Sequence, residues 1–144
     1  MRQSFTLNSP DDTAKLASRL AKELNKNSCL ALFGDFGVGK TFFTKQICNF
    51  LETENFATSP SFVILNIYRG VLPVFHFDLY RIKSSYELAD LAIFDYFGKG
   101  VVIIEWADVA DDILPDDCIR IFFSYNGKSK REVVIEQKGA NNGE

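Results

Sequence analysis

The chain has 144 residues, 47% of them hydrophobic and 24% charged, which is ordinary for one globular domain with a hydrophobic core. Its formal net charge of −3 excludes a general electrostatic attraction to nucleic acid, so any contact with RNA requires a local patch or a partner. The three cysteines and the one histidine lack the spacing of a metal site, which favours buried free thiols in a reducing compartment. Because we expect neither a signal peptide nor a membrane-spanning run, we predict a cytoplasmic protein.

The first predicted elements are a short edge strand over residues 2–7 and a helix that begins at Ser9. Ser9 suits the N-cap, and Pro10 suits the first helical position. Apolar side chains then recur at helical spacing, namely Leu16, Ala17, Leu20, Ala21 and Leu24. This stripe predicts that the helix packs on a sheet, and the crossover to an apolar strand at residues 29–33 favours parallel strands.

Residues 34–41, Gly-Asp-Phe-Gly-Val-Gly-Lys-Thr, match the phosphate-binding pattern G-x-x-x-x-G-K-[ST] at every defined position. An apolar strand precedes them and an amphipathic helix over residues 41–51 follows, which is the context that the motif requires. The glycines let successive N–H groups point at one anion, and the helix adds its dipole. Lys40 can reach the outer phosphates, and the Thr41 hydroxyl can bind Mg²⁺. The motif therefore predicts nucleotide binding.

Two β-rich runs, residues 62–68 and 71–78, are split by Arg69 and Gly70 and indicate an antiparallel hairpin. The sheet is therefore expected to be mixed. Pro73 within the second run argues for an edge position or an irregularity there, because proline cannot donate to the hydrogen-bond ladder.

The C-terminal half begins with a short helix whose start, at Ser84, has a capping-box pattern. A strand of four aliphatic residues and a carboxylate follows at residues 101–105. Residues 118–125 and 131–137 then form a hairpin around Asn-Gly. Residues 138–144 have nothing to bury, so we predict a single domain over residues 1–137 with a fraying tail.

A phosphate loop needs a carboxylate at the end of a neighbouring strand, to hold the magnesium shell or to polarise a water molecule. Glu105 closes the aliphatic strand, and Asp78 closes the second strand of the hairpin. Taken alone, each acid is explained as well by a structural role, at a strand end or as a turn cap, as by a functional one. Beside the phosphate loop, we expect at least one of them to be functional. Residues 58–62, Thr-Ser-Pro-Ser-Phe, form either a polar turn or a switch segment. By themselves, His76 and Trp106 are better interpreted as core residues.

These motifs occur in a fixed order: GDFGVGKT, SPSF, HFDLYR, IEW and LP. The ordered set resembles the bacterial TsaE (YjeE) family from the first helix to the strand at Arg131. That family comprises small P-loop ATPases needed for threonylcarbamoyl modification of the adenosine beside the tRNA anticodon. The predicted fold is accordingly a three-layer α/β P-loop NTPase-like fold, with a mixed, mainly parallel sheet and antiparallel hairpins.

The resemblance also implies a set of site residues. Asp78 and Glu105 are the expected catalytic acids, and Thr41 and Glu105 are the expected magnesium ligands. The expected nucleotide-binding residues are Asp11, Gly34, Asp35, Gly37, Val38, Gly39, Lys40, Thr41, Phe42, Ser59, Ser61, Trp106 and Arg131. Among these, Asp11 is expected on the adenosine side, and Arg131 is expected to approach from the C-terminal hairpin.

The first functional hypothesis is an ATPase, with ATP and Mg²⁺ as cofactors, that acts as a nucleotide-driven switch in tRNA modification. The resemblance implies partnership with TsaD and TsaB type proteins, which carry the transfer chemistry, so contact with tRNA is expected to be indirect. Hydrolysis by the chain alone is expected to be slow, because no arginine occupies a recognisable finger motif. A small GTPase is excluded, because no [NT]-K-x-D motif follows the loop. Two alternatives stay open: a small-molecule kinase using the same loop, disfavoured by the few scattered arginines, and a binding module without hydrolysis, disfavoured by the two acids.

Overall fold

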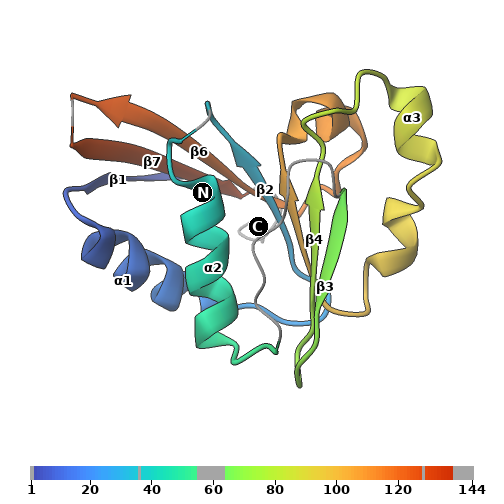
Figure 1. The fold of residues 1–144 in the computed structure, drawn as a ribbon, viewed down its shortest axis with the longest axis horizontal. Helices are drawn as coiled ribbons and strands as arrows, with labels where there is room; N and C mark the ends of the chain where they lie inside the picture. Colours follow the sequence, from blue (N-terminus) through green and yellow to red (C-terminus); the bar gives the residue numbers. More distant parts are fainter. Residues whose placement is uncertain (1, 36, 55–63, 128, 138–144) are drawn as a thin grey trace, which may run out of the picture.

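The computed structural model describes residues 2–35, 37–54, 64–127 and 129–137. Within these ranges, one seven-stranded sheet has the order β1-β7-β6-β2-β5-β4-β3 (Figure 1). The strands are β1 (Arg2–Leu7), β2 (Cys29–Phe33), β3 (Leu65–Tyr68), β4 (Val74–Asp78), β5 (Val101–Glu105), β6 (Ile119–Asn126) and β7 (Lys130–Gln137). The helices are α1 (Pro10–Ala21), α2 (Lys40–Phe50) and α3 (Ser85–Ala89), with short 3₁₀ segments η1 (Ile93–Tyr96) and η2 (Ala107–Ile113).

The sheet is mixed, as predicted. Its central strands β6, β2, β5 and β4 run parallel to one another. The pairs β3–β4, β6–β7 and β1–β7 are antiparallel and complete the two ends of the sheet. The predicted edge strand over residues 2–7 is confirmed, and it pairs with β7. The predicted tail at residues 138–144 lies outside the described residues.

The second strand of the β3–β4 hairpin is shorter than the sequence indicates, and residues 62–63 of the first predicted run lie outside the described residues. β4 begins at Val74, directly after Pro73, and it lies between β3 and β5 instead of at the edge. Pro73 precedes the strand, so its missing N–H group removes no ladder bond, and its carbonyl accepts from the Val101 N–H group at 2.9 Å. The proline therefore sets where the strand begins, and β3 takes the edge position.

Alternating side chains of the central strands divide the core into two parts, one on each face of the sheet. Leu30 and Leu32 of β2 pack with the apolar sides of α1 and α2. Ala31, between them, packs in the second cluster with α3, η1 and η2. Figure 1 shows α1 and α2 together on one side of the sheet and α3 on the other. The predicted three-layer arrangement is therefore observed, and the three cysteines are buried free thiols, as expected.

Two features of the fold bring the predicted motifs to one edge of the sheet. The first is the parallel arrangement of β2, β5 and β4, whose carboxyl ends meet at the same edge. Glu105 pairs in register with Leu32 on one side and with Asp78 on the other. The second is the start of α1, where the Ser9 side chain accepts from the Asp12 N–H group, as the sequence predicts.

Candidate nucleotide-binding site

The loop after β2 requires glycine at two positions. Gly34 has a φ of 143°, and a Cβ atom there would lie 2.8 Å from the carbonyl oxygen of Phe123. Gly39, the N-cap of α2, has a φ of 117°. The structure describes α2 in full, and the helix begins with neither a side-chain cap nor an acidic residue in its first turn. Its first N–H groups and its dipole are therefore available to an anion.

Lys40 is a buried lysine at the start of α2, with only 4% of its surface exposed. Its Nζ atom donates to the Gly34 carbonyl and lies 3.4 Å from the centre of the Trp106 ring. Trp106 in turn packs on Tyr80, with ring centres 5.1 Å apart. Burial lowers the pKa of Lys40, while nearby carboxylates, Glu105 first among them, oppose that shift. The ammonium group is therefore held between the loop and a group of acids.

The two predicted acids lie side by side at the ends of β5 and β4 but differ in their surroundings. Glu105 is 4% exposed and accepts from the Thr41 hydroxyl, with Oγ1–Oε1 and Oγ1–Oε2 distances of 3.2 and 3.4 Å. Its Oε2 atom also lies 2.7 Å from Nε2 of His76, which is a hydrogen-bonded buried residue, as expected. Asp78 is half-buried and accepts from the Tyr80 N–H group at 3.0 Å. Burial raises the pKa of Asp78, and the Glu105 charge adds to the increase.

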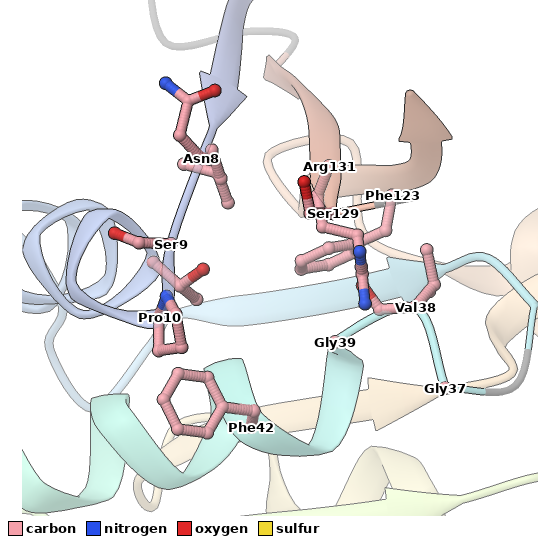
Figure 2. Close-up of a pocket in the computed structure, with 12 residues that line it drawn as sticks. Asn8, Ser9, Pro10, Gly37, Val38, Gly39, Phe42, Phe123, Ser129 and Arg131 are labelled. Carbon is pink, nitrogen blue, oxygen red and sulfur yellow. The ribbon is translucent and has the colours of Figure 1, made fainter. Parts of the chain in front are cut away.

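A pocket of about 420 Å³ adjoins the phosphate loop on the α1 side. Figure 2 shows Pro10 and Phe42 along one side of this pocket, with Phe123 and Arg131 along the other. Nε of Arg131 donates to the Val38 carbonyl at 3.1 Å. The guanidinium group of Arg131 also lies over an aromatic ring of β6, 4.5 Å from its centre. Arg131 therefore ties the C-terminal hairpin to the phosphate loop.

The family model for TsaE, described as threonylcarbamoyl adenosine biosynthesis protein, matches residues 7–133. The chain belongs to the TsaE family. A TsaE protein of Bacillus subtilis is 36% identical over 132 residues, which cover 90% of this chain and 82% of the relative. A TsaE protein of Rickettsia conorii is 35% identical over 128 residues, covering 88% of this chain and 73% of the relative. The crystal structure of YdiB from Bacillus subtilis superposes with a TM-score of 0.79 at 30% identity, covering 96% of this chain and 87% of that chain.

Membership of the TsaE family favours the first functional hypothesis over a small-molecule kinase, because the relatives are named for tRNA threonylcarbamoyladenosine biosynthesis. Among the residues that the structure describes, no helix is long and apolar enough to cross a bilayer.

The structure brings most of the residues predicted from the TsaE resemblance to one place. The loop and the pocket together contain Gly34, Asp35, Gly37, Val38, Gly39, Phe42 and Arg131. Lys40, Thr41, Asp78, Glu105 and Trp106 surround the start of α2. Ser59 and Ser61 lie outside the described residues.

Asp11 is the predicted residue that the structure separates from the others. It lines a different hollow, with Lys15 and Arg19, on the outward side of α1. A helix turns about 100° per residue, so Asp11 faces away when Thr13 faces the core. The pocket is instead lined on this side by Asn8, Ser9, Pro10 and Thr13. The sequence contained a signal that Thr13 could line a site, because it is a polar residue within the apolar stripe of the helix.

The Thr41 hydroxyl and the Glu105 carboxylate provide hard oxygen donors, which suit Mg²⁺. Across the ranges that the structure describes, no three His, Cys, Asp or Glu side chains converge as a metal-binding group. A hydroxyl and a carboxylate fit Mg²⁺, which usually keeps one or two protein ligands and takes the others from phosphates and water. The residues at this site therefore fit a magnesium ion that arrives with a nucleotide.

Proposed function

We propose that this protein binds ATP with Mg²⁺ and hydrolyses it in support of tRNA threonylcarbamoyladenosine biosynthesis. The contact that carries this proposal joins Thr41 to Glu105 at 3.2 Å, directly beside the buried Lys40. A hydroxyl, a carboxylate and an ammonium group thereby converge at a glycine-rich helix start, which is the combination that phosphoryl transfer uses. The name shared by the relatives, tRNA threonylcarbamoyladenosine biosynthesis protein TsaE, supports the pathway.

The nucleotide would divide between the two halves of the site. The phosphates would lie on the loop from Gly37 to Thr41, where N–H groups and the Lys40 ammonium donate charge-assisted hydrogen bonds. The adenosine would enter the adjoining pocket of about 420 Å³, whose apolar walls include Pro10, Phe42 and Phe123. Arg131 would stiffen both parts, because it lines the pocket and holds the Val38 carbonyl.

The two acids take different roles in this proposal. Thr41 and Glu105 would hold the magnesium ion, which supplies positive charge against the phosphates when bound. Glu105 suits this role because it is buried and already accepts from Thr41. Asp78 ends the neighbouring strand and is half-exposed, which suits the orientation of a water molecule at the terminal phosphate.

Hydrolysis by the isolated chain is expected to be slow. Arg131, which lines the pocket beside the loop, already donates to the Val38 carbonyl. An arginine finger raises the rate of related enzymes about 10³- to 10⁵-fold, so a chain without one would hydrolyse ATP slowly. We propose that TsaD and TsaB type partners raise the rate and contact the tRNA, and that the switch segment at residues 58–62, with Ser59 and Ser61, responds to the nucleotide. The cytoplasm, which holds the tRNA, is the expected location.

The test measures ATP turnover by the purified chain, alone and mixed with TsaD and TsaB type proteins. We expect slow turnover alone, faster turnover in the mixture, and loss of both in Lys40→Ala. Lys15→Ala, which removes an exposed lysine from the outward side of α1, is the matched control and should behave as wild type. The threonylcarbamoyladenosine content of tRNA in cells that depend on each variant should follow the same order. Nucleotide binding without hydrolysis in every mixture would contradict the proposal and favour the binding module.

A further inference from the structure

A chain of hydrogen bonds crosses the sheet to the proposed magnesium site. It starts at Tyr68 on the edge strand β3, whose hydroxyl lies 3.4 Å from Nδ1 of His76 on β4. Nε2 of His76 then lies 2.7 Å from Oε2 of Glu105 on β5. Glu105 in turn accepts from Thr41 at the start of α2. The chain thus links an outer strand to the first turn of the nucleotide-binding helix.

Strand register accounts for these contacts. His76 pairs with Ile103, so Glu105 is its diagonal neighbour on the same face of the sheet. Tyr68 pairs with Val74, which makes it the diagonal neighbour of His76. Side chains two residues apart on a strand share a face, and long side chains reach across such a diagonal. The contacts therefore follow from the register of the three strands.

The His76–Glu105 contact is buried, so its loss would leave Glu105 with one donor fewer and little water to replace it. Each of Tyr68, His76 and Glu105 is 4% exposed, so water does not readily replace a lost partner. A buried carboxylate needs donors to remain favourable, and Glu105 receives one from each side, His76 and Thr41. We assign the ring proton to Nε2, which donates to the acceptor-only carboxylate of Glu105, while Nδ1 accepts from the Tyr68 hydroxyl.

We propose that His76 is a positioning residue that fixes the carboxylate of Glu105 for magnesium, and that Tyr68 supports the far side of the His76 ring. The inference rests on the proposed function, because it assigns a role within that metal site. Partners that orient a metal ligand through a hydrogen bond typically account for about 10- to 100-fold in metal affinity. His76 would act through Glu105 and touch neither the nucleotide nor the metal.

The first test is spectroscopic and needs no nucleotide. His76 is the one histidine in the sequence, so the imidazole nitrogens of a ¹⁵N-labelled sample give a single pair of signals. We expect a protonated Nε2 and an unprotonated Nδ1, and we expect Tyr68→Phe to shift the Nδ1 signal while the proton stays on Nε2, where Glu105 accepts it. A proton held on Nδ1 in the wild type would overturn the assignment.

The second test measures ADP affinity by calorimetry as the Mg²⁺ concentration is varied. We expect His76→Leu to raise the half-saturating Mg²⁺ concentration about 10- to 100-fold, with ADP affinity in chelator unchanged. His76→Gln keeps an N–H group near the position of Nε2 and should stay within about threefold of wild type. Val74→Ala removes a buried side chain from the same strand and face and controls for lost packing.

The outcomes separate the two proposals. Wild-type protein that binds ADP equally with and without Mg²⁺ would refute the metal site, and with it the role of His76. If ADP binding to the wild type depends on Mg²⁺ and His76→Leu leaves that dependence unchanged, the positioning role alone is refuted. The same holds if Val74→Ala changes the Mg²⁺ dependence as much as His76→Leu does. Where His76→Leu fails to fold, His76→Phe replaces it, and an unchanged Mg²⁺ dependence in that variant would overturn the proposal.

Discussion

Replacing Glu105 by glutamine removes one negative charge at the proposed magnesium site and leaves the side-chain shape almost unchanged. The amide oxygen of glutamine can still accept from Nε2 of His76, and its NH2 group can donate to the Thr41 hydroxyl oxygen, which lies 3.2 Å from the native carboxylate. The fold should therefore persist, and the attraction for a divalent cation should fall. Glu105→Gln thus isolates the electrostatic part of the site.

The size of the effect follows from the burial of Glu105, which is 4% exposed and hence poorly screened by solvent. A divalent ion about 4 Å from a unit charge is attracted by about 8 kcal/mol at an effective dielectric constant of about 20, twice the value for two unit charges. The amide dipole, together with the water and phosphate ligands of the ion, compensates most of that attraction, so we expect a net loss of about 2 kcal/mol, which is roughly a 30-fold weakening of Mg²⁺-dependent binding. Affinity for ADP in chelator should stay near the wild-type value.

Asp78→Asn is the matched comparison, because Asp78 pairs in register with Glu105 at the same edge of the sheet. Asp78 is half-exposed and accepts from the Tyr80 N–H group, a contact that the asparagine oxygen can keep. We expect ADP affinity to stay within about twofold, while hydrolysis falls about 10²- to 10⁴-fold, the usual contribution of a proton-transferring side chain.

The assay pairs calorimetry of ADP, with and without Mg²⁺, with single-turnover hydrolysis of ATP for both variants. The roles of the two acids would be reversed if Asp78→Asn abolished Mg²⁺-dependent binding and Glu105→Gln spared it. If both variants changed ADP binding and ATP hydrolysis only slightly, neither acid would have the proposed role in the site.

Three further predictions concern the loop and its surroundings. Gly34→Ala should abolish ADP binding and lower the melting temperature, because the added Cβ atom would lie 2.8 Å from the Phe123 carbonyl oxygen at a φ of 143°; unchanged binding would contradict the loop geometry. Burial lowers the pKa of Lys40 from 10.5, so its ammonium should lose its proton at a lower pH than that of an exposed lysine. ADP affinity should therefore begin to decline below pH 10.5 as the pH is raised, and constant affinity up to that pH would refute this prediction. Arg131→Ala should weaken ADP binding by about 1–2 kcal/mol, or roughly 5- to 30-fold, by freeing the Val38 carbonyl, and an Arg131→Ala protein with wild-type affinity would show that this contact is dispensable.

The parts of the site that could be predicted from sequence are those set by local chemistry. The phosphate loop follows from two glycines, a lysine and a threonine between an apolar strand and a helix. The Ser9 and Pro10 pattern likewise gives the start of α1, because capping depends on residues a few positions apart. Glu105 was a candidate because it ends an aliphatic run, and parallel pairing brings that end beside the loop.

The parts that could not be predicted depend on how distant segments meet. The His76–Glu105 contact needs the register between β4 and β5, and no local pattern fixes which residues of two strands pair. The contact of Lys40 with Trp106 similarly joins α2 to the turn after β5. The TsaE resemblance implied Asp11 on the adenosine side, but the helical period places it on the outer side of α1.

The most direct test of the account measures ATP and ADP binding by calorimetry to wild-type protein and to Lys40→Ala, with folding of the variant checked by its melting transition. Lys40 carries the ammonium that faces the buried Glu105 and the other nearby carboxylates, so its removal takes away a charge-assisted contact and leaves those acids to repel phosphate. We predict Mg²⁺-dependent binding to the wild type and a loss of at least about 100-fold in the variant, or about 2.7 kcal/mol. Unchanged affinity in a folded Lys40→Ala protein would contradict the assignment of this loop as the nucleotide site.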